Sequence, residues 1–419
     1  MEVGQRIDVP VSPGALLGST TVVRSLNERM LLDHLRSTGP QSRADLARTT
    51  TLSKPPVSVA LANLESAGLV RPIGLVAGRP GRAALLYEAN PTAGYVVGID
   101  VGREWVRIAV ADLAGTILGR RDGTNRARTG PALVAEVRRL SHEAAAEAGI
   151  DWDAVACTVL ASPGVLDPGA DRLELTPNLP GWGRAGLVEE LRTALGAGLV
   201  VENDINLAAV GESAFGQGRD VSSFVLLSIG TGTGLGIVIN GEVYRGAHGR
   251  AGEVAFLPLP DEGGGSTTGG GGAGRARSAG PGPRRVRTRG MFEELAAAEG
   301  VVRTAHGLGL TGATTAREVF DAAAAGDPVA LRAVDVEGTR IGAAITAIAA
   351  IADPELVVRT GGIGRNLDLL RPSIERQLHV LSPLAPRVER SELGADAALL
   401  GALATALGRA RSSVFLAQR

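Results

Sequence analysis

Alternating glycines behind an apolar run constrain the fold of this chain more than any other stretch. Residues 224–227 are apolar and typical of a buried strand, and the sequence GTGTG follows at residues 230–234. A second apolar run, residues 235–239, predicts the returning strand, and Asn240-Gly241 favours a tight hairpin turn. Glycines in this spacing let the backbone approach a phosphate or another oxygen-rich ligand. A tight glycine-rich hairpin without a ligand would have the same pattern.

A second strand–turn–strand unit occurs earlier in the chain. A mostly apolar strand is predicted over residues 96–100, Gly102 follows it, and a second strand is predicted over residues 106–110. Because two such units lie far apart in one chain, we expect two related lobes that face a shared cleft. The strand predicted over residues 356–360 leads into Gly361 and Gly362, which predicts a further point of close backbone approach.

A carboxylate and an amide stand at the end of another predicted strand. Residues 199–202 are apolar up to Glu202, and Asn203 and Asp204 follow directly, before a helix predicted over residues 205–215. Open α/β sheets bind ligands at the carboxyl ends of their strands, so this is a position for a ligand-binding pair. Asp204 could accept a proton from a hydroxyl nucleophile. It could also be the N-cap of the helix, and the two roles are compatible.

The first ninety residues have the pattern of a DNA-binding module. Ser42 and Ser53 are suited to cap two short helices, over residues 43–48 and about 54–68, joined by a tight connection. The sequence GRPGR at residues 78–82 predicts a β-wing whose arginines can enter a minor groove. A helical protein-interaction module with a basic turn is the alternative. The candidate DNA contacts are Ser53, Lys54, Ser58, Arg79 and Arg82.

Composition sets limits on the remaining possibilities. The chain has 419 residues, enough for two or three domains, and a formal net charge of −1, so it is not a polybasic nucleic-acid binder as a whole. Its single cysteine, Cys157, excludes an intramolecular disulfide and a Cys-x-x-Cys metal site. The longest apolar stretch, residues 342–352, is too short to span a bilayer. We therefore expect a soluble, cytoplasmic protein that has no membrane partner.

Sequence patterns also predict the domain boundaries. We expect a flexible tail over residues 1–20, a winged helix-turn-helix domain over residues 21–90 and a two-lobed domain over residues 95–419. Residues 261–290 contain eleven glycines and six arginines with almost no apolar residues. Such a segment cannot bury enough surface to offset its ordering entropy, so it predicts a disordered basic insertion.

Taken in order, these stretches resemble the ROK family of repressors, open reading frames and sugar kinases, in its winged helix-turn-helix regulator branch. The resemblance covers about residues 22–410. It implies an α/β fold class, with an N-terminal winged helix-turn-helix followed by a two-lobed actin-like fold of the sugar kinase, Hsp70 and actin type. The matching stretches are SRADLARTTTLSKPPVS, GRPGR, GIDVG, PNLPGW, VENDINLAAVGE, GTGTGLGIVINGEVYRG, AGE at residues 251–253, and RTGGIG.

The resemblance also implies roles for individual residues. In the kinases of the family the Asp of the Asn-Asp pair is the catalytic base, which corresponds to Asp204 here. The implied sugar-binding residues are Gly164, Asn178, Asn203, Asp204, Glu253 and Glu293. The implied nucleotide and phosphate contacts are Asp100, Gly102, Gly230, Thr231, Gly232, Gly361 and Gly362.

Three departures from the family pattern argue against efficient ATP-dependent phosphorylation and against zinc. Arg103 and Glu104 stand where the kinases have Gly-Thr, and a glutamate there would repel a γ-phosphate. Phe256 stands where the family has a histidine that contacts sugar and ligates zinc, and the zinc-binding cysteines are missing. We therefore expect no metal and no cofactor.

The function predicted from the sequence is a sugar-responsive transcriptional regulator, a repressor of carbohydrate metabolism genes. Its expected partners are a double-stranded DNA operator, a small sugar or sugar derivative, and a second copy of the chain in a homodimer. Two alternatives remain open at this stage. One is a sugar kinase that kept its DNA-binding domain, and the other is a dimeric DNA-binding scaffold whose cleft holds no ligand.

Overall fold

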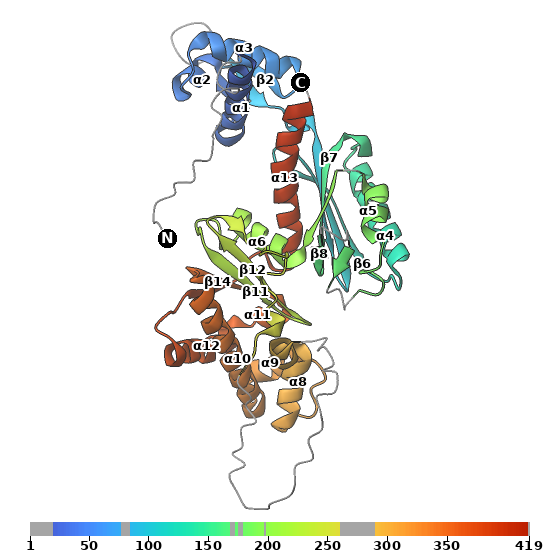
Figure 1. Cartoon of the computed structure of the whole chain (residues 1–419), viewed down its shortest axis with the longest axis vertical. Helices are drawn as coiled ribbons and strands as arrows, with labels where there is room; N and C mark the ends of the chain where they lie inside the picture. Colours follow the sequence, from blue (N-terminus) through green and yellow to red (C-terminus); the bar gives the residue numbers. More distant parts are fainter. Residues whose placement is uncertain are drawn as a thin grey trace, which may run out of the picture.

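An N-terminal module and two lobes follow one another along the chain (Figure 1). The computed structural model describes residues 20–76, 84–167, 172–174, 179–196, 198–259 and 290–417. Several predictions therefore lie outside the described residues: nearly all of the tail and of the Gly/Arg-rich insertion, the wing tip with Arg79 and Arg82, and Asn178.

The N-terminal module contains three helices and a small antiparallel sheet. Its helices are α1 (Thr20–Thr38), α2 (Arg43–Thr49) and α3 (Lys54–Ser66), and its strands are β1 (Gln41–Ser42), β2 (Val70–Val76) and β3 (Ala84–Ala89), in the order β1-β3-β2. Ser42 caps α2 as predicted, because its hydroxyl accepts a hydrogen bond from the backbone N–H of Asp45. Ser53 occupies the N-cap position of α3, but its side chain makes no capping hydrogen bond.

The first lobe is built on a five-stranded sheet with the order β10-β7-β4-β5-β6. Its elements are β4 (Tyr95–Val101), β5 (Trp105–Asp112), β6 (Ile117–Thr124), α4 (Gly130–Glu147), β7 (Val155–Ser162), α5 (Leu187–Leu195) and β10 (Leu199–Asn203), with the small hairpin β8 (Val165–Asp167) and β9 (Arg172–Glu174). Strands β4, β7 and β10 run parallel, whereas β4–β5 and β5–β6 are antiparallel. The carboxyl ends of the parallel strands therefore share one edge, which faces the second lobe.

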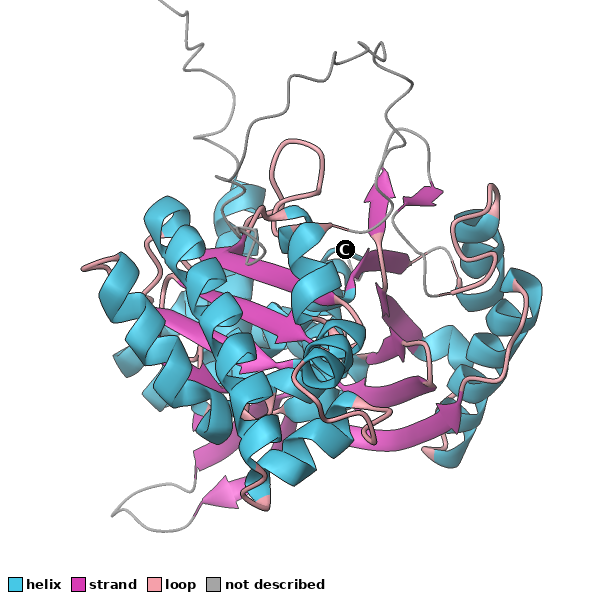
Figure 2. Cartoon of the chain, turned by 90° about the horizontal axis from the view of Figure 1, so that it is seen from below, coloured by secondary structure: helices cyan, strands magenta, loops and turns pink. Residues whose placement is uncertain are grey.

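The second lobe has the same strand order, written here from the opposite edge of the sheet as β13-β12-β11-β14-β15. Strand β11 therefore corresponds to β4, and β12 to β5. Its strands are β11 (Phe224–Ile229), β12 (Thr233–Ile239), β13 (Glu242–Val243), β14 (Leu356–Thr360) and β15 (Arg387–Arg390). Its helices are α7 (Met291–Ala296), α8 (Ala298–Gly307), α9 (Ala316–Ala324), α10 (Pro328–Ala352), α11 (Gly361–Gly364) and α12 (Leu367–Leu381). Figure 2 shows helices flanking the strands of the lobes. Asn240 and Gly241 both have positive φ, as the predicted hairpin turn requires.

Two long helices connect the parts of the molecule. Helix α6 (Asp204–Phe215) packs along α13 (Ala397–Ala417), and a Cβ added to Gly401 would lie 1.7 Å from the carbonyl oxygen of Leu207. The α13 helix crosses the first lobe and ends beside the N-terminal module (Figure 1). There Val414 and Phe415 belong to the same apolar core as Leu31 of α1.

Most predicted helices begin or end within a residue or two of the observed ones. Helix α10 begins where Asp327 and Pro328 favour a helix start, since the Asp327 side chain accepts hydrogen bonds from the N–H groups of Val329 and Ala330. Asp204, by contrast, is the first residue of α6 and not its N-cap. The capping side chain is that of Asn203, because β10 continues through Asn203.

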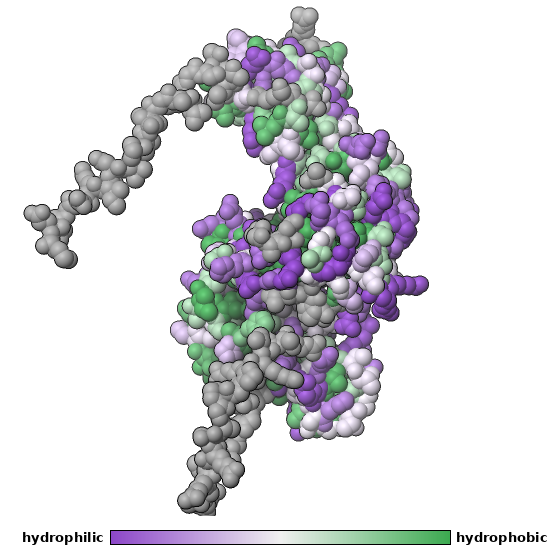
Figure 3. Space-filling model, turned by 45° about the vertical axis from the view of Figure 1, so that its right-hand side comes forward, coloured by the Kyte–Doolittle hydropathy of each residue, from purple (hydrophilic) through white to green (hydrophobic). Residues whose placement is uncertain are grey.

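The surface shown in Figure 3 is mostly hydrophilic, with apolar residues in small groups. Within the part of the chain that the structure describes, no helix is both long enough and apolar enough to cross a membrane.

Candidate functional site

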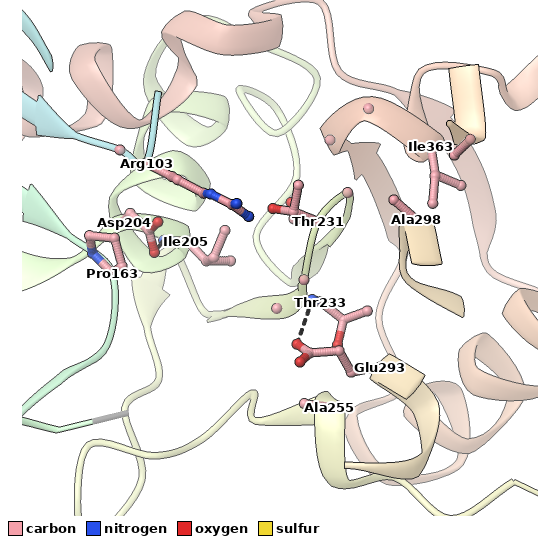
Figure 4. A pocket seen from close by; sticks show the side chains of 18 of the residues that line it. Arg103, Pro163, Asp204, Ile205, Thr231, Thr233, Ala255, Glu293, Ala298 and Ile363 are labelled. Carbon is pink, nitrogen blue, oxygen red and sulfur yellow. Dashed lines mark hydrogen bonds between the residues drawn. The ribbon is translucent and has the colours of Figure 1, made fainter. Parts of the chain in front are cut away.

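A cleft of about 1880 Å³ opens between the two lobes. Its walls come from the β4–β5 turn, the N-terminus of α6, the β11–β12 turn, helices α7 to α9, and the segment that follows β14. Figure 4 shows side chains from both lobes directed into this space.

Most of the predicted ligand contacts line this cleft, although their roles remain predictions. Asp100 is not among the lining residues, because it is buried behind the wall and paired with Arg107 at 3.0 Å. The predicted residues that do line the cleft are Gly102, Gly164, Asn203, Asp204, Gly230, Thr231, Gly232, Glu253, Glu293, Gly361 and Gly362.

Asn203 and Asp204 have different roles at the start of α6. The Oδ1 atom of Asn203 accepts hydrogen bonds from the N–H groups of Ile205 and Asn206, and its Nδ2 donates to the Gly164 carbonyl at 2.9 Å. The amide of Asn203 is therefore committed to holding the helix against the Gly164 loop. The Asp204 carboxylate accepts hydrogen bonds from backbone N–H groups at the start of the helix, including that of Ile205 at 2.9 Å, and faces the cleft. It is the group of this pair with capacity left for a ligand.

Burial and neighbouring carboxylates favour the protonated form of the acids at this site. Burial, and then the charges of Asp100 and Glu253, raise the pKa of Asp204 to about 7. Burial also raises the pKa of Asp100 to about 6, although the Arg107 guanidinium opposes the shift. The pKa of Glu253 is raised by burial and by the charge of Glu293. At neutral pH Asp204 can therefore either donate or accept a proton, as recognition of a hydroxyl group requires.

Glu293 joins α7 to the glycine-rich turn of the second lobe. Its Oε2 accepts a hydrogen bond from the N–H of Thr233 at 3.2 Å (Figure 4). A Cβ added to Gly232 would lie 3.1 Å from the same oxygen, so the turn passes close to the carboxylate. The hydroxyl of Thr233 is buried and finds no hydrogen-bond partner among the described residues.

The residues at the predicted departures from the family pattern lie in the cleft. Arg103 and Glu104 occupy the β4–β5 turn, and both side chains are exposed and line the cavity. Phe256 also lines it and keeps 48% of its surface exposed, so its ring stands in open space rather than in the core. Among the described residues, no three His, Cys, Asp or Glu side chains are grouped so as to hold a metal ion.

One part of the cleft wall was not predicted from the sequence. Asn366 lies just beyond Gly362 and donates from Nδ2 to the Gly362 carbonyl at 3.0 Å, which fixes the turn after β14. Its position shortly after the Gly-Gly pair was a usable signal. Residues of α9 and the loop before it carried no such motif and could be found only from the packing. The missed lining residues include Thr314, Thr315, Arg317, Phe320, Arg365 and Asn366.

The candidate DNA-contacting residues within the described part of the module are exposed. Ser53, Lys54 and Ser58 have accessible side chains at the start of α3. Val57, Leu61 and Leu64 of the same helix are buried against α1 and α2. The helix thus has a buried apolar stripe and an outer face of mostly small side chains, which includes Ser58 and the exposed Val59 and is compatible with a recognition helix.

Two models of known protein families match the chain. The "winged helix-turn-helix DNA-binding" model matches residues 24–71, and the "ROK family" model matches residues 96–409. A crystal structure of a ROK family transcriptional regulator, homologous to the E. coli MLC protein, has the same fold. It superposes with a TM-score of 0.71 at 23% identity, over 94% of this chain and 98% of the other. The predicted fold class, a winged helix-turn-helix followed by a two-lobed actin-like domain, is confirmed.

Curated relatives include both regulators and kinases. The xylose repressor of Bacillus subtilis is 28% identical over 244 residues, which is 58% of this chain and 63% of the repressor. The match thus spans less than two thirds of that relative. The glucokinase of Halalkalibacterium halodurans is 30% identical over 323 residues, which is 73% of this chain and 93% of the kinase. Since the ROK family model spans most of the chain, the chain belongs to the ROK family and carries an N-terminal winged helix-turn-helix module.

Proposed function

We propose that this chain is a sugar-responsive, DNA-binding transcriptional repressor that acts in the cytoplasm as a homodimer. The observation that carries the proposal is a continuous packed connection between the cleft and the DNA-binding module. Asp204 opens α6, α6 packs on α13, and α13 ends against α1. A ligand that moves the start of α6 therefore acts on the helix pair that holds the module.

The contacts along this connection are close enough to transmit a displacement. A Cβ added to Gly211 of α6 would lie 2.2 Å from the Ala397 carbonyl oxygen of α13, so the two backbones touch. At the other end, Arg29 of α1 donates to the Ser412 hydroxyl of α13 at 3.4 Å. Packed interfaces of this kind shift between discrete arrangements rather than deform continuously. A coupling of about 1–3 kcal/mol would change operator affinity about 5–150-fold.

Operator binding and its response to sugar test this proposal directly. Purified protein would select its sites from a random DNA library at low salt, and binding would be measured with and without a panel of free and phosphorylated sugars. We expect sequence-selective binding with paired half-sites, and at least one sugar compound that weakens it at least fivefold. Failure to select any sequence would contradict the proposal. Selective binding unaffected by every compound would favour the scaffold without a ligand.

A thermal-shift experiment tests ligand binding in the cleft separately from DNA binding. A ligand at 100 times its dissociation constant adds about 2.7 kcal/mol to the free energy of unfolding of the wild type. We expect that gain to be lost in Asp204→Ala. The matched control is Asp220→Ala, which removes an exposed aspartate that does not line the cleft. An equal gain in both variants would exclude Asp204 from the ligand site.

A second candidate function is a sugar kinase with a DNA-binding module. It is favoured by Asp204, whose pKa of about 7 suits a general base, and by the likeness to a glucokinase. Arg103 and Glu104 in the first phosphate turn oppose it. An ADP-release assay over common hexoses decides between the two, since turnover that is abolished in Asp204→Asn would establish the kinase.

A further inference from the structure

A small cavity lies at the joint between the DNA-binding module and the rest of the chain, where α13 ends beside the module (Figure 1). Its volume is about 170 Å³, and its described lining residues come from α1 on one side and from the C-terminal half of α13 on the other. About 10–15 Å³ of such space is enough for one water molecule, so the cavity has room for an ion of several heavy atoms. None of these lining residues belongs to the cleft between the lobes.

Positive charge exceeds negative charge around this cavity. Arg29 and Arg36 of α1 and Arg411 of α13 line it, whereas Asp33 is the single carboxylate among its described lining residues. Asp33 is shared between two of the arginines, at 3.7 Å from Nε of Arg29 and 3.1 Å from Nη1 of Arg36. Three positive charges therefore face one negative charge, and the lining residues carry a net charge of +2.

Arg411 is held at the cavity without a carboxylate partner among the described residues. It donates from Nε and Nη2 to the carbonyl oxygen of Leu113, at 3.1 and 2.9 Å, which fixes the plane of its guanidinium. Its Nη1 has no hydrogen-bond acceptor in the described part of the chain, so this atom has capacity left for a ligand.

Arg36 is the most buried charge of the group that Asp33 joins. Only 13% of its side-chain surface is exposed, compared with 53% for Arg29. Burial lowers the pKa of the Arg36 guanidinium, and the charges of Arg411 and Arg29 act in the same direction, although Asp33 opposes the shift. The three guanidinium groups thus lie close enough to repel one another, and an anion in the cavity would relieve that repulsion.

We propose that this cavity binds an oxyanion with two negative charges, inorganic phosphate or the phosphate group of a small monoester, which bridges α1 and α13. The planar fork of a guanidinium matches the oxygens of such an ion. Two negative charges balance the net charge of the lining residues, whereas a carboxylate or a chloride ion would leave one positive charge in excess. The inference goes beyond the proposed function, because it adds a ligand site outside the cleft, at the joint through which the cleft acts on the module.

A thermal-shift titration of the full chain at constant ionic strength tests the proposal. The probes are inorganic phosphate, sulfate and glycerol phosphate, with acetate and chloride as monoanions. The variants are Arg36→Gln, Arg29→Gln, Asp33→Asn and the control Arg24→Gln. Arg24 is another arginine of α1, with 60% of its side-chain surface exposed, and it does not line the cavity.

We expect phosphate to raise the melting temperature of wild type more than chloride does. Arg36→Gln should weaken the apparent affinity for phosphate about tenfold, and the more exposed Arg29→Gln should weaken it by less. Asp33→Asn should tighten it about two- to fivefold, because this variant removes the one carboxylate of the cavity. Arg24→Gln should leave it unchanged.

The other anions identify the ligand class. Sulfate should act as phosphate does, and tighter binding of glycerol phosphate than of inorganic phosphate would identify a monoester as the ligand, whereas the reverse would identify the free ion. An equal response to phosphate in wild type and all variants would place the anion elsewhere, for instance in the cleft, and would overturn the proposal. A response to acetate as strong as that to phosphate would also overturn it. Operator selection is measured without phosphate, so the repressor function is tested separately.

Discussion

The two lobes have the same strand order but present different turns to the cleft. In the second lobe, the turns after β11 and β14 are rich in glycine and carry no charged side chain at Gly230, Thr231, Gly232, Gly361 or Gly362. In the first lobe, the turn after β4, which is equivalent to the turn after β11, carries two charged side chains, Arg103 and Glu104. The repeated fold therefore presents uncharged, glycine-rich turns to the cleft on one side and side-chain charge on the other.

Packing explains why a side chain is not tolerated at Gly361, in the turn after β14, but would be tolerated at Gly102, in the turn after β4. Gly361 has a φ of 83°, and a Cβ there would lie 2.3 Å from the Ile229 carbonyl oxygen. Gly102 has no positive φ, and its nearest contact would be the Trp105 carbonyl oxygen at 3.4 Å, an ordinary distance. The turn after β14 thus passes directly against the end of β11, whereas the turn after β4 leaves room for a side chain. Charge can therefore change in the first lobe without affecting the fold.

Alanine substitutions should separate the two turns most strongly. Gly361→Ala is expected to lower the free energy of unfolding by about 3–5 kcal/mol, because it adds both backbone strain and a steric overlap with β11. Gly102→Ala should change it by less than about 0.5 kcal/mol, as a substitution outside such features does. Urea unfolding followed by circular dichroism measures both. Similar losses in the two variants would show that the turns are equally constrained.

Buried carboxylates provide a second contrast, in the pH dependence of stability. The pKa of Asp204 is raised to about 7 in the folded state, so its proton stabilises the fold below about pH 4 and this contribution is lost as pH rises toward 7. Asp204→Asn should therefore be more stable than wild type by about 2 kcal/mol at pH 8, and equal to it near pH 4.

Asp100→Asn is the matched comparison for this prediction. Burial also raises the pKa of Asp100, but only to about 6, because the Arg107 guanidinium at 3.0 Å opposes the shift. Asp100→Asn should therefore also be more stable than wild type at pH 8, but by less than Asp204→Asn, and equal to wild type near pH 4. Guanidinium unfolding at pH 4 and pH 8 measures both variants, and a larger gain in Asp100→Asn than in Asp204→Asn would contradict the different environments of the two acids.

Sequence patterns were sufficient where a single local rule decided the outcome. Asp327 followed by Pro328 set the start of α10, since a capping carboxylate and a proline in the first turn both favour that position. The alternating glycines predicted the hairpin between β11 and β12, and Asn240-Gly241 predicted the turn between β12 and β13. In each case the residues that determine the structure are neighbours in the chain.

The sequence failed where the outcome depended on distant residues. Asn203 and Asp204 are both good capping residues, and the choice between them follows from the pairing of Asn203 with Ser162 in the neighbouring strand. Likewise, Arg103 was identified as a departure from the family turn, but its position opposite Thr231 depends on how the lobes face each other. The burial of Asp204, which raises its pKa, also depends on how the two lobes face each other.

The smallest expected effect concerns Glu104, the second charged residue of the first-lobe turn. Its exposed carboxylate lines the cleft beside Arg103 and should oppose a bound phosphate group. Glu104→Thr should therefore tighten the binding of a phosphate-bearing ligand, for which ATP is the probe, about two- to fivefold, and the change should be small because an exposed charge is screened by solvent. Calorimetry at low ionic strength measures the change. Weaker binding in Glu104→Thr would mean that the carboxylate orients Arg103, and the two charges would then act as one unit rather than as opposing parts of the turn.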